Sequence, residues 1–304
     1  MKWKLVLAGV ASLHASMVFA DFDQGLFEYK KGNFASALYE WRQSAEKGDI
    51  ESQYRLGMMY EKGQGVPSNL KKASKWYRLS ADAGHPPAQI KVADMYLSGR
   101  GEKADPAAAA LWYQRAARQG AAQAQFRLGL LHLEGRGVEK NDAEAAKWFK
   151  AAAEQNVTSA QNNLGSLYEN GRGVEQDDAK AFQWYSKAAK EGDAYAQNNL
   201  GAMYARGKGV KRNHAWAVFW FATAAQNGNR VAADNAAASL RHLRTKRIRV
   251  ATANIRAGNS TSHDIVAKVK QGDVLHILGS TNGWSQVYLQ QQQRLGWISS
   301  SLLE

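Results

Sequence analysis

The side chains that carry out catalysis in most enzymes are thinly spread along this chain of 304 residues. Its seven histidines show no i,i+3 or i,i+4 pairing, and it contains no GxSxG, HExxH, P-loop or dinucleotide-binding motif. Asp177 and Asp178 resemble a general-acid pair, but Asp177 stands where a helix begins and is explained as its N-cap. Without cysteine there is no thiolate nucleophile and no cysteine-ligated zinc site. We therefore expect a protein that is not an enzyme, with no catalytic residues, no metal site and no cofactor.

The first twenty residues have the pattern of a secretory signal peptide. Lys2 and Lys4 precede an apolar run, and small residues stand around Ala20, where cleavage is expected. The alternative is an uncleaved membrane anchor, although His14 and the serines interrupt the run. The sequence thus predicts a periplasmic or secreted protein without a transmembrane segment in the mature chain. The lack of cysteine also excludes a lipid-modified cysteine and disulfide bonds.

The chain is basic, with a formal net charge of +13. Six basic residues and no acidic one lie between Arg241 and Arg256. Such a run can bind nucleic acid, but in an exported protein an anionic envelope surface is the better match. A solvated linker that adds solubility explains the run equally well. We expect no nucleic-acid partner.

A sequence pattern that recurs every 36 residues determines the architecture. Each copy reads Gln-x-x-Leu-Gly-x-x-Tyr-x-x-Gly-x-Gly-Val, with a few substitutions. A fixed period without insertions is typical of a solenoid, in which each unit packs on its neighbours and the whole usually serves as a binding surface. The glutamines that begin the five copies are Gln53, Gln89, Gln125, Gln161 and Gln197.

Each copy predicts two antiparallel helices, here named helix A and helix B. In the first copy helix A should run from Ser52 to Lys62 and end at the glycine pair Gly63 and Gly65, since glycine readily takes the left-handed conformation. Asn or Asp should cap the start of helix B, at Asn69, Asp105, Asn141, Asp177 and Asn213. Helix B should end at Gly84, Gly120, Asn156, Gly192 and Gly228. Between these caps, each helix B carries a Trp followed by Tyr or Phe, which we expect to pack between the helices.

This pattern resembles the Sel1-like repeat, a relative of the tetratricopeptide repeat, over residues 50–229. The resemblance implies five repeats, preceded by a degenerate capping repeat at 21–49 and followed by a capping helix at 230–243. The second repeat departs from the pattern at Ala93 and Glu102, and the third at His132. These changes do not break the register.

The helical period stops after a basic linker at 244–247, and short β-type segments follow. The landmarks Asn254 to Gly258, Lys270 to Asp273, Gly283-Trp284 and Gly296-Trp297-Ile298 resemble a bacterial SH3-like (SH3b) domain over 248–304. Such barrels often bind peptides or peptidoglycan, so the resemblance implies an envelope ligand. Its candidate contacts are Trp284, Tyr288 and Trp297, whose flat apolar faces suit a peptide. The alternative is that these rings belong to the core of the small barrel.

A tetratricopeptide-like solenoid would place helix A on its concave face. The repeat register puts Tyr54, Ile90, Phe126, Asn162 and Asn198 along one stripe of that face. A second stripe reads Met58, Asp94, Leu130, Ser166 and Ala202, with Leu97 and Leu133 nearby. We expect a peptide to bury side chains over the apolar half and to hydrogen-bond to the two asparagines. The alternative is that the apolar positions pack between repeats.

The fold class expected is mainly α: an α/α solenoid of helix-turn-helix repeats followed by a small all-β SH3-like barrel. The function expected is an exported non-catalytic scaffold of the cell envelope. Its repeats would bind a protein or peptide partner, and its barrel peptidoglycan or a second peptide. The alternatives are a regulator or inhibitor of a cell-wall enzyme and a cell-wall-directed hydrolase.

Overall fold

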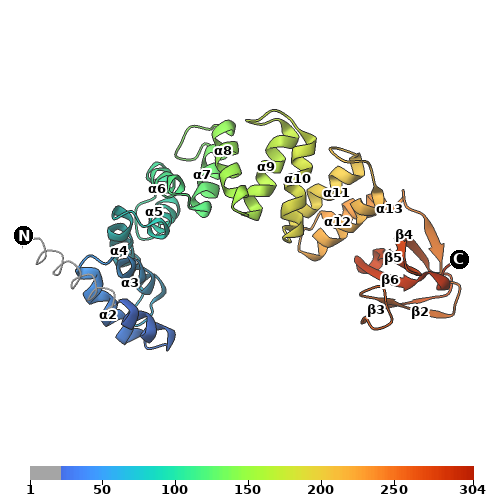
Figure 1. The fold of residues 1–304 in the computed structure, drawn as a ribbon, viewed down its shortest axis with the longest axis horizontal. Coiled ribbons are helices and arrows are strands. Elements are labelled where there is room, and N and C mark those ends of the chain that lie inside the picture. The colour runs from blue at the N-terminus through green and yellow to red at the C-terminus, as the bar shows by residue number, and fades with distance from the viewer. Residues whose placement is uncertain (1–21) are drawn as a thin grey trace, which may run out of the picture. The chain divides into compact units, whose positions relative to one another are not determined.

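The computed structural model describes residues 22–304, so the expected signal peptide at 1–20 lies outside the described residues. The chain divides into two compact units between Ala151 and Ala152. The first unit starts with a helix over residues 22–30 and continues with pairs of antiparallel helices (Figure 1). These are α2 (Phe34–Glu46), α3 (Ile50–Lys62), α4 (Leu70–Asp82), α5 (Pro86–Ser98), α6 (Pro106–Arg118), α7 (Ala122–Glu134) and α8 (Asp142–Glu154), within which the first unit ends.

The second unit completes the repeats and adds a β-sheet. Its helices are α9 (Thr158–Asn170), α10 (Asp178–Lys190), α11 (Ala194–Arg206), α12 (His214–Gln226) and the shorter α13 (Ala232–Leu240). The odd-numbered helices from α3 to α11 are the helices A of the five repeats, and the even-numbered ones from α4 to α12 are the helices B. The first helix A begins at Ile50, two residues before the expected Ser52, because the Asp49 side chain accepts the Ser52 N–H at 2.7 Å and caps the helix there.

The caps of helix B are confirmed in all five repeats. The Oδ1 atoms of Asn69, Asp105, Asn141, Asp177 and Asn213 each accept a backbone N–H of the first helical turn, at 2.8–3.1 Å. The residues expected to end helix B, from Gly84 to Gly228, have φ between 63° and 95°. A polar side chain therefore caps the start of each helix B, and a residue in the left-handed conformation follows its end.

The glutamine that begins each copy of the pattern joins its repeat to the preceding helix B. Each glutamine is buried, and its Nε2 donates to a carbonyl oxygen eight residues earlier, near the C-terminus of that helix. Each acceptor carbonyl also accepts the backbone N–H of the residue three positions later, just past the helix end, so the glutamine adds a second hydrogen bond to the last turn of that helix. The acceptors are the carbonyls of Ala45, Ala81, Ala117, Ala153 and Ala189, at 3.0–3.2 Å.

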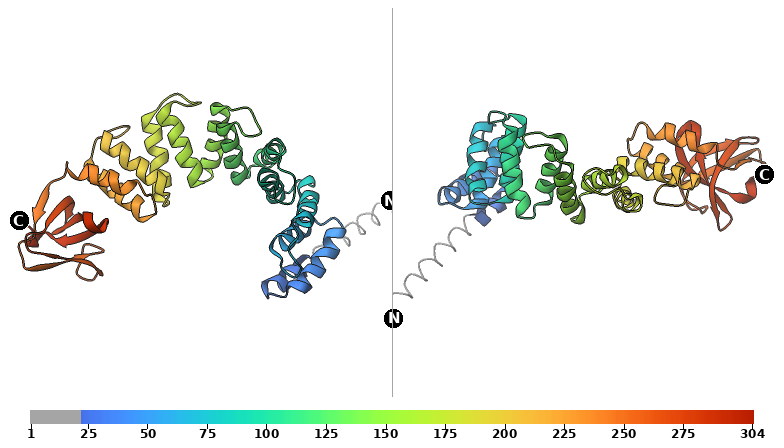
Figure 2. Two further views of the ribbon diagram at one scale, coloured as in Figure 1. Left: turned by 180° about the vertical axis from the view of Figure 1, so that it is seen from behind. Right: turned by 90° about the horizontal axis from the view of Figure 1, so that it is seen from above.

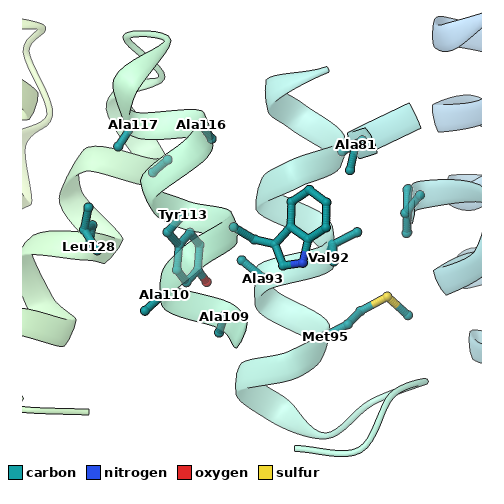
Figure 3. Close-up of a cluster of buried hydrophobic side chains, with 14 of the residues drawn as sticks. Ala81, Val92, Ala93, Met95, Ala109, Ala110, Tyr113, Ala116, Ala117 and Leu128 are labelled. Atoms are coloured by element: carbon teal, nitrogen blue, oxygen red, sulfur yellow. The ribbon is translucent and has the colours of Figure 1, made fainter. Parts of the chain in front are cut away.

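Within a repeat, the glycine of the Leu-Gly pair lets helix B approach helix A. A Cβ on Gly57 would stand 2.5 Å from the Tyr77 ring, and one on Gly201 would stand 2.7 Å from Phe221. In the second repeat Ala93 takes the glycine position and is buried in the same cluster as Tyr113. Figure 3 shows this alanine-rich contact between α5 and α6. The fully buried ring of each Trp-Tyr or Trp-Phe pair is the second one, because it is the one that faces the small residue of helix A.

The second glycine of the Gly-x-Gly turn lies against the preceding helix B at Gly65, Gly101, Gly137 and Gly209. A Cβ on Gly101 would lie 2.7 Å from the Leu70 carbonyl oxygen, and one on Gly209 would lie 2.1 Å from that of Asp178. Both acceptors belong to the first residue of the preceding helix B. The turn therefore needs glycine twice over, for its positive φ and for the contact with backbone.

The buried ring of helix B is a tyrosine only where helix A of the same repeat supplies a carboxylate. Where the ring is Phe149 or Phe221, helix A carries leucine or alanine at those positions. Burial, followed by the bond to the carboxylate, raises the pKa of each tyrosine that has one. The pairs are Tyr77 with Glu61 at 2.6 Å, Tyr113 with Asp94, and Tyr185 with Glu169 at 3.0 Å.

The C-terminal sheet is antiparallel throughout, with the order β1-β4-β5-β6-β2-β3. Its strands are β1 (Thr245–Arg247), β2 (Thr252–Arg256), β3 (Ile265–Lys270), β4 (Val274–Thr281), β5 (Trp284–Leu289) and β6 (Arg294–Ser299). The stretch expected as a linker at 244–247 is thus mostly an edge strand, because its backbone pairs with β4 from Thr245 opposite His276 to Arg247 opposite Val274. The expected Asn282-Gly283 turn joins β4 to β5, with φ of 48° and 77°.

Within the second unit the sheet packs against α12 (Figure 2). Tyr288 of β5 is 2% exposed and lies in one cluster with Val218 and Phe221 of α12 and Leu240 of α13. Leu295 of β6 packs against the same cluster. The sheet therefore shares an apolar contact with the last repeat, apart from its own core around Ile255, Val287 and Ile298.

Replacement by alanine should cost more at the second glycine of a Gly-x-Gly turn than at the glycine that follows helix B. Gly192→Ala places a side chain at φ 91° in open space, which should lower the free energy of unfolding by about 1–2 kcal/mol. Gly209→Ala adds a clash with the Asp178 backbone and should lower it by roughly 3 kcal/mol or more. Urea unfolding followed by circular dichroism measures both. Equal losses in the two variants would contradict the close approach.

Tyr77→Phe should weaken the protein more at neutral than at acid pH. Burial favours protonation of Glu61, but the Tyr77 hydroxyl and the Lys91 ammonium outweigh it and hold the pKa of Glu61 below its ordinary value. The resulting stability is present at pH 7 and is lost as the pH falls through the folded pKa. The variant should lose about 1–2 kcal/mol at pH 7 and less at pH 3, in urea titrations at both values. In a Glu61→Gln background the pH dependence of this loss should vanish; its persistence would assign the effect to another group.

Candidate functional site

The helix-A face of the first unit contains a hollow of about 460 Å³. α3, α5 and α7 form it together with the turns that follow α5 and α7, so three successive repeats contribute to it. Leu70, Met95 and Leu97 supply apolar lining. Its charged lining is formed by Glu61, Lys91, Asp94, Arg100, Arg127 and Arg136.

The two carboxylates of this hollow are already bound. Glu61 accepts from Tyr77 and forms an ion pair with the Lys91 Nζ at 2.9 Å, and Asp94 accepts from Tyr113. The arginines are less engaged. Arg136 donates from Nη2 to the Leu97 carbonyl at 3.1 Å, whereas the guanidiniums of Arg100 and Arg127 have no hydrogen bond or ion pair among residues 22–304. Positive charge in the hollow therefore exceeds what its own carboxylates neutralise.

The second unit has a hollow of about 290 Å³ at the equivalent repeat positions. It lies on α9, α11 and α13, and every residue compared here stands three periods after its counterpart in the first unit. Amides replace the cations Lys91 and Arg127 and alanine replaces Asp94, whereas the carboxylate at the Glu61 position is kept. The counterparts are Glu169 for Glu61, Asn199 for Lys91, Ala202 for Asp94, Ala205 for Leu97 and Asn235 for Arg127.

The amides of the second hollow form a ladder between repeats. Asn199 donates from Nδ2 to Asn162 Oδ1 at 3.0 Å, and Asn235 donates to Asn198 Oδ1 at 2.8 Å. Glu169 accepts from Tyr185 and lies 3.8 Å from Arg206 Nη1 and 3.9 Å from Lys208 Nζ. Asn162 and Asn198 thus use their carbonyl oxygens within the protein.

The expected groove residues are divided between packing and lining. The Tyr54 ring lies 5.7 Å from Tyr77 and 5.0 Å from His85, and Phe126 lies 5.9 Å from Phe149. Met58 and Ile90 pack on the core of the first unit. The two rings thus pack within their own repeat, and Met58 and Ile90 pack on the shared core, so these apolar positions are taken up by packing inside the solenoid. Among the residues expected to bind the partner, Asn198 lines a hollow. Asp94, Leu97 and Ala202, which were named with the two stripes but not as binding residues, also line one. Leu130 and Asn162 are half-buried.

Sequence reasoning missed the residues one position after the first stripe. That position reads Arg55, Lys91, Arg127, Asn163 and Asn199 in successive repeats. It changes from basic to amide, and three of its five members line the hollows or pair with residues that do. The sequence did contain a signal, namely a basic residue that recurs with the repeat period. The binding residues were assigned instead to the apolar stripe beside it.

The three aromatic residues expected on the barrel do share one face of the sheet. In the β5–β6 ladder Trp284 stands opposite Ser299, Gln286 opposite Trp297, and Tyr288 opposite Leu295, so these side chains project to the same side. Helices α12 and α13 cover the Tyr288 end, which leaves that ring no surface for a ligand. Trp284 and Trp297 are half-buried and lie outside the barrel core, contrary to the alternative that they form it.

A second aromatic surface went unrecognised in the sequence. Trp216 of α12 is 48% exposed, and its position is charged or small in the other repeats, as at Lys180. It stacks on Tyr204 at 6.2 Å and meets Phe219 edge-on at 5.4 Å. Beside this cluster lies a hollow of about 400 Å³ that contains Phe182, Tyr204, Trp220, Lys187 and Lys190 among its lining residues.

The described part of the chain shows no set of three or more His, Asp or Glu side chains arranged to hold a metal ion. His214 and His242 stack at 4.2 Å, and burial followed by the neighbouring charge lowers the pKa of His214. Among the helices between residues 22 and 304, none has the length and apolar character that a bilayer crossing requires.

Two solved structures are similar to this chain over the repeats. A protective antigen present in uropathogenic Escherichia coli strains is 38% identical over 67% of this chain, with a TM-score of 0.65, and the match covers 44% of that chain. A Sel1 repeat protein from Oxalobacter formigenes is 32% identical over 70% of this chain and 88% of its own, with a TM-score of 0.67. No curated protein matches the sequence.

Family models match both parts of the chain. The bacterial SH3 domain model matches residues 251–304, in agreement with the sheet. The Sel1 repeat model matches residues 50–85, 86–120, 122–157, 158–193 and 194–229, in register with the five helix pairs. These five matches cover more than half of the chain, and the protein belongs to the Sel1 repeat family.

Proposed function

We propose that this protein is an exported, non-catalytic scaffold of the bacterial cell envelope. The helix-A face of its repeats holds a polypeptide partner, and its SH3 domain contacts peptidoglycan or a second peptide. The observation that carries the proposal is the pair of hollows at equivalent repeat positions, lined by different side chains in the two units.

A repeat protein can select a partner when the same surface positions recur in every repeat but carry different side chains. The glutamine, glycine and capping residues are the same or similar in all repeats and explain the fold. Lys91 and Arg127 against Asn199 and Asn235 have no such role in common, so packing does not explain their difference. Because the helix pairs are alike and the side chains that line the hollows differ, the repeats can make different contacts with different parts of one partner.

The barrel supports the second contact through its free tryptophans. Trp284 and Trp297 lie on one sheet face, outside the core, and remain half-exposed beside the end that α12 covers. Flat aromatic rings at the surface favour binding of peptides and of sugar rings. The basic residues between Arg241 and Arg256 favour an anionic ligand or surface nearby.

A photocrosslinking residue placed on the helix-A face should capture the partner in intact cells. p-Benzoylphenylalanine in place of Arg127 or of Asn199 should give discrete adducts with a polypeptide, because both side chains line the hollows. The same residue in place of Lys75, an exposed side chain of α4 that lines neither of these two hollows, is the control and should give none. Adducts from Lys75 alone, or from no position, would contradict a partner on the helix-A face.

The full chain should sediment with insoluble peptidoglycan through its free tryptophans. Trp284→Ser and Trp297→Ser together should lower the retained fraction several-fold, since aromatic contacts dominate such sites. Trp216→Ser, which removes an exposed tryptophan from α12, should leave retention unchanged. Thermal unfolding of each variant checks that the barrel stays folded. Equal retention of all variants would remove the tryptophan site and leave the barrel to a peptide ligand.

A further inference from the structure

We infer that the hollow of the first unit binds a carboxylate-rich segment of the partner polypeptide, with Arg100, Arg127 and Arg136 as its ligands. The inference rests on the proposed function and assigns a chemistry to one of its two hollows. It rests on three features: charge that the protein does not neutralise, the placement of the guanidiniums, and the apolar lining between them.

The first feature is unneutralised charge. Lys91 and Glu61 form an ion pair at 2.9 Å and need no further partner. Asp94 is bound by the Tyr113 hydroxyl, and no ion pair joins it to an arginine among the described residues. The lining has four cations against the two carboxylates of Glu61 and Asp94, and apart from the bond from Arg136 to Leu97 the three guanidiniums have no hydrogen-bond acceptor among the described residues.

The second feature is the origin of the three arginines. Arg100 belongs to the turn after α5, Arg127 to the first turns of α7, and Arg136 to the turn after α7. The bond from Arg136 Nη2 to the Leu97 carbonyl, at 3.1 Å, holds one of the three in place and leaves its other donors free. The remaining two are exposed and without contacts of their own, so a ligand orders them at the time of binding.

The third feature distinguishes a peptide from a nucleic acid. Leu70, Met95 and Leu97 line the hollow between the charges, and its lining contains no aromatic side chain. Sites for single-stranded nucleic acid combine positive charge with aromatic rings on which bases stack. Arginines around an aliphatic hollow of this size suit a few Glu or Asp side chains and their methylene groups instead.

The second hollow provides an internal comparison. Asparagine stands there in place of Lys91 and Arg127, and Ala202 in place of Asp94. The cation that lines it, Arg206, and the nearby Lys208 already lie within 4 Å of Glu169. The preference for carboxylates therefore belongs to the first unit.

Fluorescence anisotropy of the full chain with fluorescein-labelled hexaglutamate tests the inference. The peptide should bind, and added salt should weaken it, because the contact is electrostatic and exposed. Arg100→Ser with Arg127→Ser should raise Kd about tenfold or more, since two charge-assisted contacts are lost. Lys71→Ser with Lys75→Ser removes the same charge from two exposed side chains of α4 that line a different hollow, and should change Kd less than about twofold. Unlabelled hexathymidylate should not displace the peptide.

Three results would overturn the inference. They are absence of binding at low salt, equal weakening by the arginine and lysine pairs, and displacement of the peptide by hexathymidylate at equal or lower concentration. Both arginines are exposed and unpaired, so their loss should leave the melting temperature unchanged, which makes a binding defect interpretable. Photocrosslinking from position 199 separates this inference from the proposed function. If adducts form there but hexaglutamate does not bind, the carboxylate preference is wrong and the proposed function stands.

Discussion

A buried glutamine that donates to the last turn of the preceding helix is the contact on which the repeat register depends. Nε2 of Gln197, for example, lies 3.0 Å from the Ala189 carbonyl, which also accepts the Gly192 N–H just past α10. Because the bond reaches backbone, it makes no demand on the side chains of the helix that it holds. The turn glycines act in the same way, since Gly209 approaches the backbone of Asp178 and not its side chain. Repeats joined through backbone can change their exposed residues without losing their spacing, and the hollows differ for that reason.

The tyrosine–carboxylate pairs show how the repeats accommodate negative charge on the helix-A face. Glu61 and Glu169 stand at the edge of their hollows, where an unpaired carboxylate would oppose an anionic ligand. A tyrosine from helix B binds each of them, and cations complete the set. In the second repeat the carboxylate moves one turn earlier, to Asp94, and the tyrosine still reaches it. The choice between tyrosine and phenylalanine in helix B thus follows the helix-A residue opposite, and both are local to one repeat.

Sequence periodicity predicted the helix pairs and their caps because these depend on short-range chemistry, whereas the β-domain was predicted from its short β-type segments and its resemblance to an SH3-like domain. Asn and Asp caps, left-handed glycines and the small residue opposite the ring act within a few residues or within one repeat. It was harder to predict which side chains of the helix-A face line the hollows. Tyr54 and Phe126 have the residue types of a peptide groove, but each ring also has an aromatic neighbour on helix B at under 6 Å. Only the relative rotation of helix A decides which of two adjacent positions is covered, and that rotation depends on packing between repeats. Likewise the edge strand at 245–247 has a basic sequence typical of a linker, and its pairing with β4 is tertiary.

The contact between the sheet and α12 limits what the barrel can bind. α12 is apolar on all its faces, whereas a helix with one exposed side normally carries polar residues there. One of its faces meets Tyr288 and Leu295, and these project from the same sheet surface as Trp284 and Trp297. A ligand that needed the whole of that surface would have to displace α12 and expose Val218 and Phe221 to water, at a cost of several kcal/mol. A ligand satisfied by the tryptophan end pays no such penalty. The barrel is therefore suited to a small ligand that contacts only the Trp284 and Trp297 end of this sheet face. The last repeat lies beside that end.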